Sequence, residues 1–397
     1  MLDSARPSER VASQSSPLQL LGYEDGAMQN PLYQSTASQE ILVSADSHMA
    51  EPLDLWDKRL PAAFRDRVPR PHAPEQSEAP QYARGRGWDP VARLQDIAWD
   101  GISAEVLYPT LGVQMYRVDE PEVEEAWARV YNDYVIEFCS VAPDRYWGLA
   151  LISMYNVDHA IEELERCRAA GMVGATIWLV PPDHLLFSSP DHYERFWAAA
   201  QDLEMPVSLH INAGHGQYRA RPPASSVAKQ RYSVNFHKFA AQNALIDIIC
   251  SGVLERYPRL KIVVAEIGVG WIPYWLQDAD HHFQYRELSH LPLLPSEYFK
   301  RQVYATFIDD AVGASMLPRW GLGNFIWSND FPHSDGVWPA SRDVVQRTLG
   351  HLSPQQRARV VWKTTAELYG KSVRAPLPIP EGTAPDSQWS RRLQAAR

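Results

Sequence analysis

Eight short hydrophobic runs recur along the middle of the chain, and each is rich in β-branched or aromatic residues. Short apolar runs of this composition are typical of strands buried in a parallel sheet. Between several of them, hydrophobic residues recur every three or four positions, as in 120–142 and 156–171, which predicts amphipathic helices. The runs lie at 41–48, 102–110, 146–153, 174–180, 206–212, 261–268, 303–309 and 324–331.

This alternation of strands and helices predicts an α/β fold, a (β/α)8 TIM barrel. An open doubly wound sheet is the alternative, but its first strand is normally followed by a glycine-rich G-x-G-x-x-G turn, which this sequence lacks. The interval from about 50 to 100 is too long for a simple loop, so we expect an insertion after the first strand. A second long loop is expected at 213–234. Loops that follow barrel strands build the active site.

The two ends of the chain differ from this middle region. Residues 1–39 are rich in Ser, Gln, Pro and Asn without an apolar period, which predicts a flexible N-terminal arm. Residues 371–397 are Pro-rich and then basic, so we expect a C-terminal tail that either packs on the domain or a partner or stays solvated. The barrel domain is therefore expected at 40–370.

Composition narrows the class of protein. A formal net charge of −10 over 397 residues argues against nucleic acid, whose phosphates require a basic surface. No stretch approaches the roughly 20 apolar residues that cross a bilayer, and the polar N-terminus lacks the apolar segment of a secretory signal. Cys139, Cys167 and Cys250 lie far apart, which favours reduced thiols. We therefore expect a cytoplasmic protein without membrane or nucleic-acid partners.

Ionisable side chains end four of the predicted strands. The first strand ends in Asp-Ser-His, and residues two apart in a strand point to the same side. The fifth ends in His, the sixth carries Glu and the eighth carries Asp. Imidazole and carboxylate are preferred ligands of divalent zinc, iron and manganese, and a bound cation offsets the cost of burying such charges. The predicted metal ligands are Asp46, His48, His210, Glu266 and Asp330.

Structural roles compete with this interpretation. A lone His at a strand end is more often a hydrogen-bonded core residue than a ligand, although convergence from four strands argues against that here. Glu266 has the alternative of orienting a ligand or the substrate without binding metal. His333, in the turn after the eighth strand, is either a catalytic group or a neighbour of the ligands.

Three longer segments resemble a known family. They are DSHMAEPLDLWDKRLP (46–61), SGVLERYPRLKIVVAEIGVGWIPYWLQDAD (251–280) and WSNDFPHSDGVWP (327–339). They are similar to the amidohydrolase-related proteins, the superfamily branch that includes aminocarboxymuconate semialdehyde decarboxylase and γ-resorcylate decarboxylase. The resemblance runs from about 41 to 370. It implies a (β/α)8 barrel with a divalent metal at its mouth, held by Asp46, His48, His210 and Asp330.

Some positions depart from the wider superfamily. Glu266 stands where its hydrolases usually carry His, and the fourth run lacks the Lys or Glu that bridges two metals in many of them. These departures favour a mononuclear, decarboxylase-like site over a dinuclear hydrolase. We expect a metal-dependent hydrolase or carboxy-lyase for a small carboxylate-bearing molecule, with Asp330, His210 and His333 as catalytic groups.

Two other functions stay open. A small subset resembling this branch, including aminoisobutyrate hydroxylase subunits, activates dioxygen with two metals. Here His237, His281 and His282 are candidates for a second metal or for the surroundings of the first, which makes a dinuclear iron or manganese/iron oxygenase the leading alternative. The other is a non-catalytic metal-binding subunit. The resemblance also implies an oligomer, either of identical chains or with a paralogous subunit.

Overall fold

The computed structural model describes residues 40–68, 87–215, 232–285, 290–320, 322–333 and 335–380. Its centre is a sheet of eight parallel strands, which neighbour one another in chain order from β1 to β8. Backbone hydrogen bonds then join β1 to the segment after β8, from His48 N to Phe331 O at 2.7 Å and from Asp330 N to Asp46 O at 3.0 Å. The strands are β1 (Val43–His48), β2 (Ala104–Tyr108), β3 (Tyr146–Leu151), β4 (Gly174–Ile177), β5 (Val207–His210), β6 (Ile262–Ala265), β7 (Val303–Phe307) and β8 (Phe325–Trp327).

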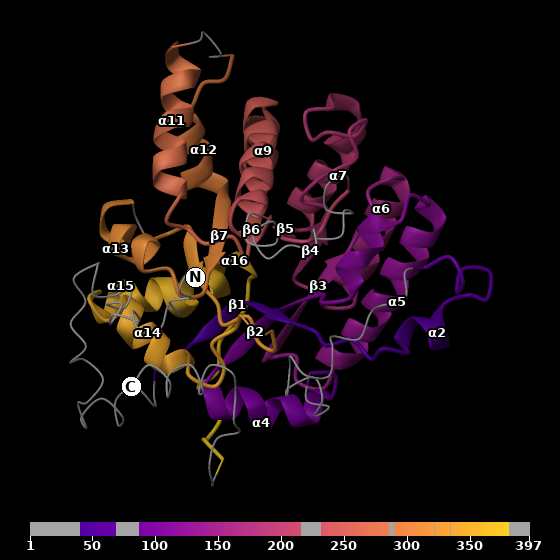
Figure 1. Cartoon of the computed structure of the whole chain (residues 1–397), viewed down its shortest axis with the longest axis horizontal. Helices are drawn as coiled ribbons and strands as arrows, with labels where there is room; N and C mark the ends of the chain where they lie inside the picture. Colours follow the sequence, from indigo (N-terminus) through magenta and orange to yellow (C-terminus); the bar gives the residue numbers. More distant parts are fainter. Residues whose placement is uncertain are drawn as a thin grey trace, which may run out of the picture.

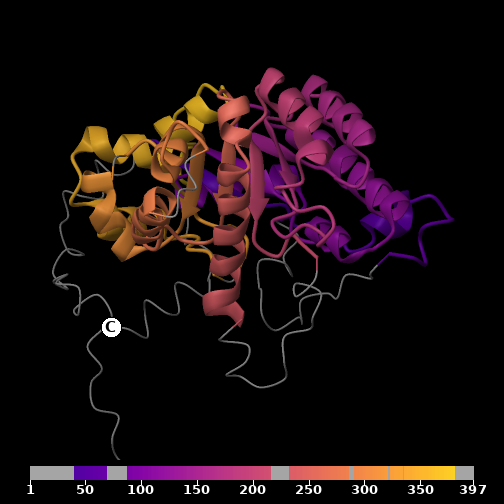
Figure 2. The ribbon, with the colours of Figure 1, turned by 90° about the horizontal axis from the view of Figure 1, so that it is seen from above.

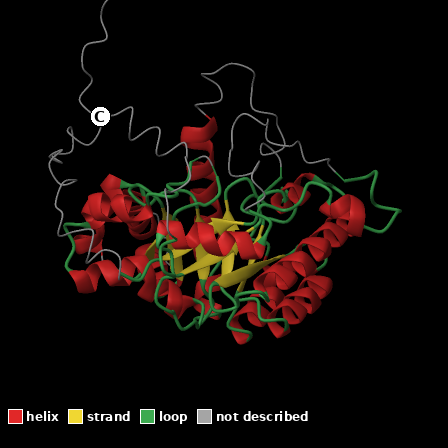
Figure 3. Ribbon diagram, turned by 90° about the horizontal axis from the view of Figure 1, so that it is seen from below, coloured by secondary structure: helices red, strands yellow, loops and turns green. Residues whose placement is uncertain are grey.

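Helices alternate with the strands and surround them (Figure 3). Helices α5, α6 and α7 cover one side of the barrel, whereas α13, α14 and α15 cover the other (Figures 1 and 2). The helices are α2 (Leu55–Arg59), α4 (Pro90–Asp100), η3 (Gly112–Arg117), α5 (Pro121–Cys139), α6 (Val157–Ala169), α7 (Pro190–Asp202), η5 (Tyr232–Phe236), α9 (His237–Cys250), α10 (Val253–Arg256), α11 (Ile272–Tyr285), α12 (Pro295–Gln302), α13 (Ala311–Trp320), α14 (Ser341–Leu349), α15 (Pro354–Ala358), η6 (Arg359–Lys363) and α16 (Thr364–Leu368).

Local sequence signals explain where several helices begin and end. The side chain of Asn156 accepts hydrogen bonds from the first backbone N–H groups of α6, and Gly171 follows that helix with a positive φ of 95°. The segment 236–258 is divided where Gly252 adopts a φ of 78°, so it forms α9 and α10. Glycine takes this left-handed conformation without a steric penalty.

The predicted (β/α)8 barrel is confirmed. The predicted insertion after β1 contains α2 and α4, while its residues 69–86 lie outside the described part of the chain. The same holds for 216–231 of the predicted long loop. None of the described helices is long and apolar enough to cross a membrane.

The two predicted extensions are largely untested. The arm, residues 1–39, lies outside the described residues, as does 381–397 of the tail. The first part of the tail packs on the barrel domain, because Arg145 donates to Ala375 O at 3.1 Å and Leu377 contacts the hydrophobic core. The domain boundaries stay a prediction.

Candidate metal centre

The predicted ligands meet at the C-terminal end of the barrel. Asp46 and His48 lie on β1, and Nε2 of His48 is 3.5 Å from Oδ1 of Asp46. The same nitrogen is 3.4 Å from Oδ1 of Asp330, which follows β8, and 3.8 Å from Oε2 of Glu266, which follows β6. From the end of β5, Nε2 of His210 lies 3.2 Å from Oε2 of Glu266 and 3.6 Å from Oδ1 of Asp46. The structure therefore brings all five side chains together.

Several atoms of this cluster are buried without a hydrogen bond. Among the described residues, no hydrogen-bond partner is found for Oδ1 of Asp46, Nε2 of His48, Nε2 of His210 or either carboxylate oxygen of Asp330. Most buried polar atoms in proteins are hydrogen-bonded, so this concentration of exceptions calls for an explanation. Ligand atoms bound at about 2.0–2.3 Å to one ion lie about 3–4 Å apart. The measured separations and the chemistry of these donors therefore fit a divalent metal ion.

Both histidines are held in the orientation that metal binding needs. Nδ1 of His48 lies 3.1 Å from Pro109 O, and Nδ1 of His210 lies 2.7 Å from Ile211 O. A carbonyl oxygen only accepts, so each Nδ1 carries the hydrogen. Each Nε2 is then left with a lone pair that faces the cluster, which is the usual arrangement of metal-bound histidines.

Electrostatics in the cluster favour a cation. Burial and the neighbouring charge of Asp46 raise the pKa of Asp330 well above its ordinary value. Burial and the charge of Asp330 likewise raise the pKa of Glu266 to about 7. Burial alone would lower the pKa of His210, but the close approach and negative charge of Asp46 and Glu266 raise it well above its ordinary value. Three carboxyl groups share this site, and a bound cation would relieve their repulsion.

His333 adjoins the cluster. Its Nδ1 lies 3.0 Å from Oδ1 of Asp330, and its Nε2 lies 3.1 Å from the hydroxyl of Thr110. Its ring packs on that of His48 with centroids 3.9 Å apart. The side chain keeps 25% of its surface exposed, so it reaches from a buried carboxylate toward the mouth.

The three histidines considered for a second metal lie in two different environments. His237 begins α9 half-buried, and burial followed by the charge of His210 lowers its pKa to about 4. His281 and His282 are exposed on α11 instead. His282 pairs with Asp278 at 3.8 Å, and the ring of His281 stacks on Tyr285. The buried face of α11 consists of Ile272, Pro273, Leu276 and Phe283, so the structure does not bring the histidine pair to the cluster.

Two buried charged residues near the cluster were missed from the sequence. The carboxylate of Glu51 accepts backbone hydrogen bonds from Thr110, Leu111 and Gly112 at 2.9–3.1 Å, and so holds the segment that touches His48 and His333. Arg93 on α4 donates to His48 O at 2.7 Å. Glu51 lies in the 46–61 motif, three residues after a predicted ligand, which was an available signal. Arg93 is one of several arginines in the insertion, and nothing in the sequence distinguishes it from the others.

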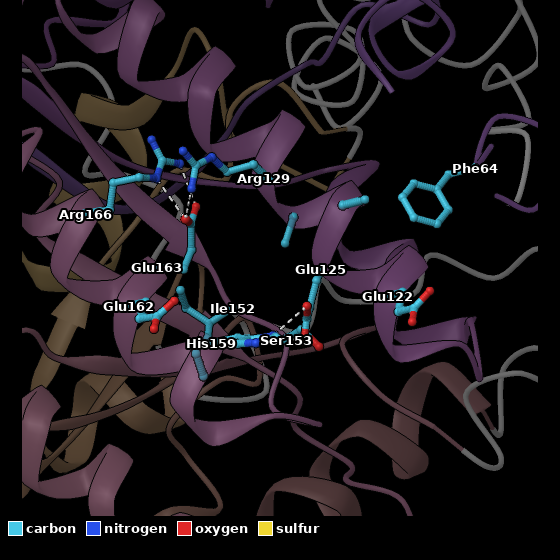
Figure 4. A pocket seen from close by; sticks show the side chains of 13 residues that line it. Phe64, Glu122, Glu125, Arg129, Ile152, Ser153, His159, Glu162, Glu163 and Arg166 are labelled. Carbon is cyan, nitrogen blue, oxygen red and sulfur yellow. Dashed lines mark hydrogen bonds and ion pairs between the residues drawn. The ribbon is translucent and has the colours of Figure 1, made fainter. Parts of the chain in front are cut away.

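A separate hollow of about 630 Å³ lies between α5 and α6 (Figure 4). Its charged groups largely pair with one another, since Arg129 and Arg166 bind Glu163 at 2.8 and 2.6 Å. His159 similarly lies 3.0 Å from Glu125. None of the predicted ligands is among the described residues that line it. We therefore place the candidate functional site at the strand ends and not in this hollow.

Comparison with known proteins agrees with the geometry. The amidohydrolase family profile matches residues 55–371. The chain belongs to the amidohydrolase family. The γ-resorcylate decarboxylase of Rhodococcus jostii is 28% identical to it over 284 residues, which cover 63% of this chain and 82% of that protein. The 2-amino-3-carboxymuconate-6-semialdehyde decarboxylase of Dictyostelium discoideum is 26% identical over 245 residues, covering 58% and 62% of the two chains.

Solved structures show the same fold. A dihydroxybenzoic acid decarboxylase of Polaromonas, with bound manganese and the inhibitor 2-nitroresorcinol, superposes with a TM-score of 0.61 at 21% identity. The match covers 83% of this chain and 96% of that one. The predicted family resemblance and the prediction of an enzyme are thus confirmed. The metal and the individual roles of the site residues stay predictions.

Proposed function

We propose that this amidohydrolase-family chain is a divalent-metal-dependent decarboxylase of a small carboxylate-bearing organic molecule. The observation that carries the proposal is the set of buried nitrogen and oxygen atoms, without hydrogen bonds, that Asp46, His48, His210 and Asp330 turn toward one another. The named decarboxylase relatives support decarboxylation in particular. Manganese in related structures makes it the first metal to try, ahead of zinc or iron.

A divalent ion supplies a Lewis acid that attracts a carboxylate and a neighbouring oxygen of the substrate. Asp46, His48, His210 and Asp330 would hold it. Decarboxylation breaks the bond between carbon and the carboxyl group, and a proton takes the vacated position on carbon as CO2 leaves. The chain must therefore provide an acid that is protonated near neutral pH and faces the mouth.

Glu266 meets these requirements best. Burial and the charge of Asp330 raise its pKa to about 7, so it can both hold and release a proton at neutral pH. Its side chain is 16% exposed, whereas Asp46, His48 and Asp330 are almost completely buried. His333 contacts Asp330 and is positioned to replenish protons from the solvent side. We therefore assign Glu266 as the proton donor and His333 as the group that supplies protons to the site from the solvent side.

A dinuclear oxygenase is the second candidate. Its supporting observation is that the potential ligands form two groups that share His48. One group adds Glu266, Asp330 and His333, and the other adds Asp46 and His210. Hydrolysis would use the same residues as decarboxylation and stays a prediction without separate support. A cytoplasmic location and an oligomer, of identical or paralogous chains, also stay predictions.

The deciding experiment combines metal analysis with a substrate screen. We would purify the chain without added metal, measure its metal content, and follow CO2 release from 2,6-dihydroxybenzoate, related hydroxybenzoates and unsaturated amino-dicarboxylates. About one manganese or zinc per chain with CO2 release supports the proposal. Two irons per chain with oxygen uptake would favour the oxygenase. A chain that binds no divalent metal would refute both. Asp330→Asn is the inactive control.

A further inference from the structure

Thr306 links two acidic residues of the candidate metal centre. It lies on β7, fully buried, and β7 pairs with β6 on one side and β8 on the other. The backbone N–H of Glu266 donates to its hydroxyl oxygen at 2.8 Å. The hydroxyl in turn lies 2.9 Å from Oδ2 of Asp46, which is 260 residues away in the sequence. Neither link was visible from the sequence, where Thr306 is one residue of a hydrophobic run.

The chemistry of these groups fixes the direction of both hydrogen bonds. A backbone N–H only donates, so the oxygen of Thr306 accepts from Glu266. The single hydroxyl hydrogen is then free to point at Oδ2 of Asp46, which accepts it. Threonine is branched at Cβ and therefore stiff about χ1, which keeps the hydroxyl in this position.

This arrangement separates the two oxygens of Asp46. Oδ2 is engaged by Thr306, whereas Oδ1 is buried and lies 3.5 Å from Nε2 of His48 and 3.6 Å from Nε2 of His210. The same hydroxyl accepts from the backbone N–H of Glu266, whose φ of 61° is a left-handed conformation that is unfavourable for a non-glycine residue. Loss of the hydroxyl would release both acidic groups together.

We propose that Thr306 is a positioning residue of the metal centre, which presents Asp46 to a divalent ion through one oxygen and holds the turn that carries Glu266. The inference rests on the proposed metal-dependent function. It concerns a residue that is not one of the candidate metal ligands. Hydrogen-bond partners that orient metal ligands typically change metal affinity about 10–100-fold when they are removed.

The test compares Thr306→Val, which replaces the hydroxyl by a methyl group, with Thr306→Ser, which keeps the hydroxyl. Thr176→Val is the matched control, because Thr176 is an equally buried barrel threonine on β4 whose hydroxyl has no hydrogen-bond partner among the described residues. We would measure Mn²⁺ affinity by indicator competition, the visible spectrum of the Co²⁺ form, and the thermal unfolding of each metal-free protein.

We expect Thr306→Val to weaken Mn²⁺ binding about 10–100-fold and to change the Co²⁺ spectrum, because Asp46 is then free to turn. Thr306→Ser and Thr176→Val should stay within about threefold of the wild type. If Thr306→Val does not fold, Thr306→Ala is assessed in the same way.

Wild-type affinity and an unchanged Co²⁺ spectrum in Thr306→Val would overturn the inference while leaving the proposed function intact. Equal weakening by Val and Ser would also overturn it, since the hydroxyl would then not be the cause. A wild-type chain that binds no metal would instead remove the proposed function, and the inference with it.

Discussion

The buried Arg93–Glu105 pair gives the sharpest stability prediction. Both side chains are fully buried, and the guanidinium binds both carboxylate oxygens, at 2.8 and 3.1 Å. Arg93 also donates to His48 O at 2.7 Å, and its guanidinium packs over the ring of Phe331 at 4.8 Å. One side chain of α4 thus fixes β2, the end of β1 and the segment after β8. Two of those three places carry proposed metal ligands, His48 and Asp330.

Arg93→Met should therefore be severely destabilising. Removing one partner of a buried ion pair strands the other charge and costs about 3–5 kcal/mol. The lost charge-assisted bond to His48 O adds about 1.5 kcal/mol or more. We expect the free energy of unfolding to fall by about 4.5–6.5 kcal/mol, a large part of the 5–15 kcal/mol typical of whole domains.

The assay is urea unfolding of the metal-free proteins at pH 7. The double variant Arg93→Met/Glu105→Leu should recover much of the loss, because no charge is then left buried alone. Arg59→Met is the matched control. Arg59 also binds a glutamate, Glu137, at 2.7 Å, but at the surface, where such pairs contribute at most about 1 kcal/mol. A loss below about 1 kcal/mol for Arg93→Met, or no recovery in the double variant, would refute the reasoning.

Three further predictions concern metal and pH. His210→Ala and Asp330→Asn should each weaken Mn²⁺ binding by more than about 100-fold with an unchanged circular dichroism spectrum, and full metal occupancy in both would contradict the assigned site. Mn²⁺ at 100 times its Kd should stabilise the wild type by about 2.7 kcal/mol and Asp330→Asn hardly at all, as measured by chemical unfolding. Burial raises the pKa of Glu51 to about 7. The folded chain therefore retains a proton that the unfolded chain loses near pH 4.5, and this residue costs up to about 3 kcal/mol of stability as pH rises from 4.5 to 7. The free energy of unfolding of Glu51→Gln should lack this fall between pH 4.5 and 7. Parallel pH profiles of stability for the wild type and the variant would contradict the prediction.

The fold was predictable because strand composition and helix periodicity are local properties. All eight hydrophobic runs became strands of the barrel. The break between α9 and α10 at Gly252 shows the limit of such reasoning, since the sequence does not reveal that this glycine takes a positive φ. The direction of side chains along a strand also follows from alternation, which is why the sequence alone places Asp46 and His48 on one face.

The candidate site was predictable only where chemistry-bearing residues end a strand. His48 and His210 end β1 and β5, Asp46 lies two residues before the end of β1, and Glu266 and Asp330 shortly follow β6 and β8. His281 and His282 were candidates only because of their residue type. Helix α11 buries its apolar face and leaves both histidines exposed, away from the cluster. Thr306 and Arg93 act through hydrogen bonds to residues that lie 260 and 45 positions away in the sequence, so nothing local marks them. A single sequence carries no signal for such pairs.

Asp46 connects the two strained positions of the site. Glu266 and Asp330 both adopt left-handed backbone conformations, with φ of 61° and 54°. Such strain persists only where contacts with the surrounding structure hold the backbone in that conformation. The N–H of Asp330 donates to the backbone carbonyl of Asp46, and the N–H of Glu266 reaches the carboxylate of Asp46 through the hydroxyl of Thr306. Asp46 therefore has two functions that its side chain and backbone perform together. It offers one oxygen to the cluster, and it anchors the turns that carry the other two carboxyl groups toward the same point.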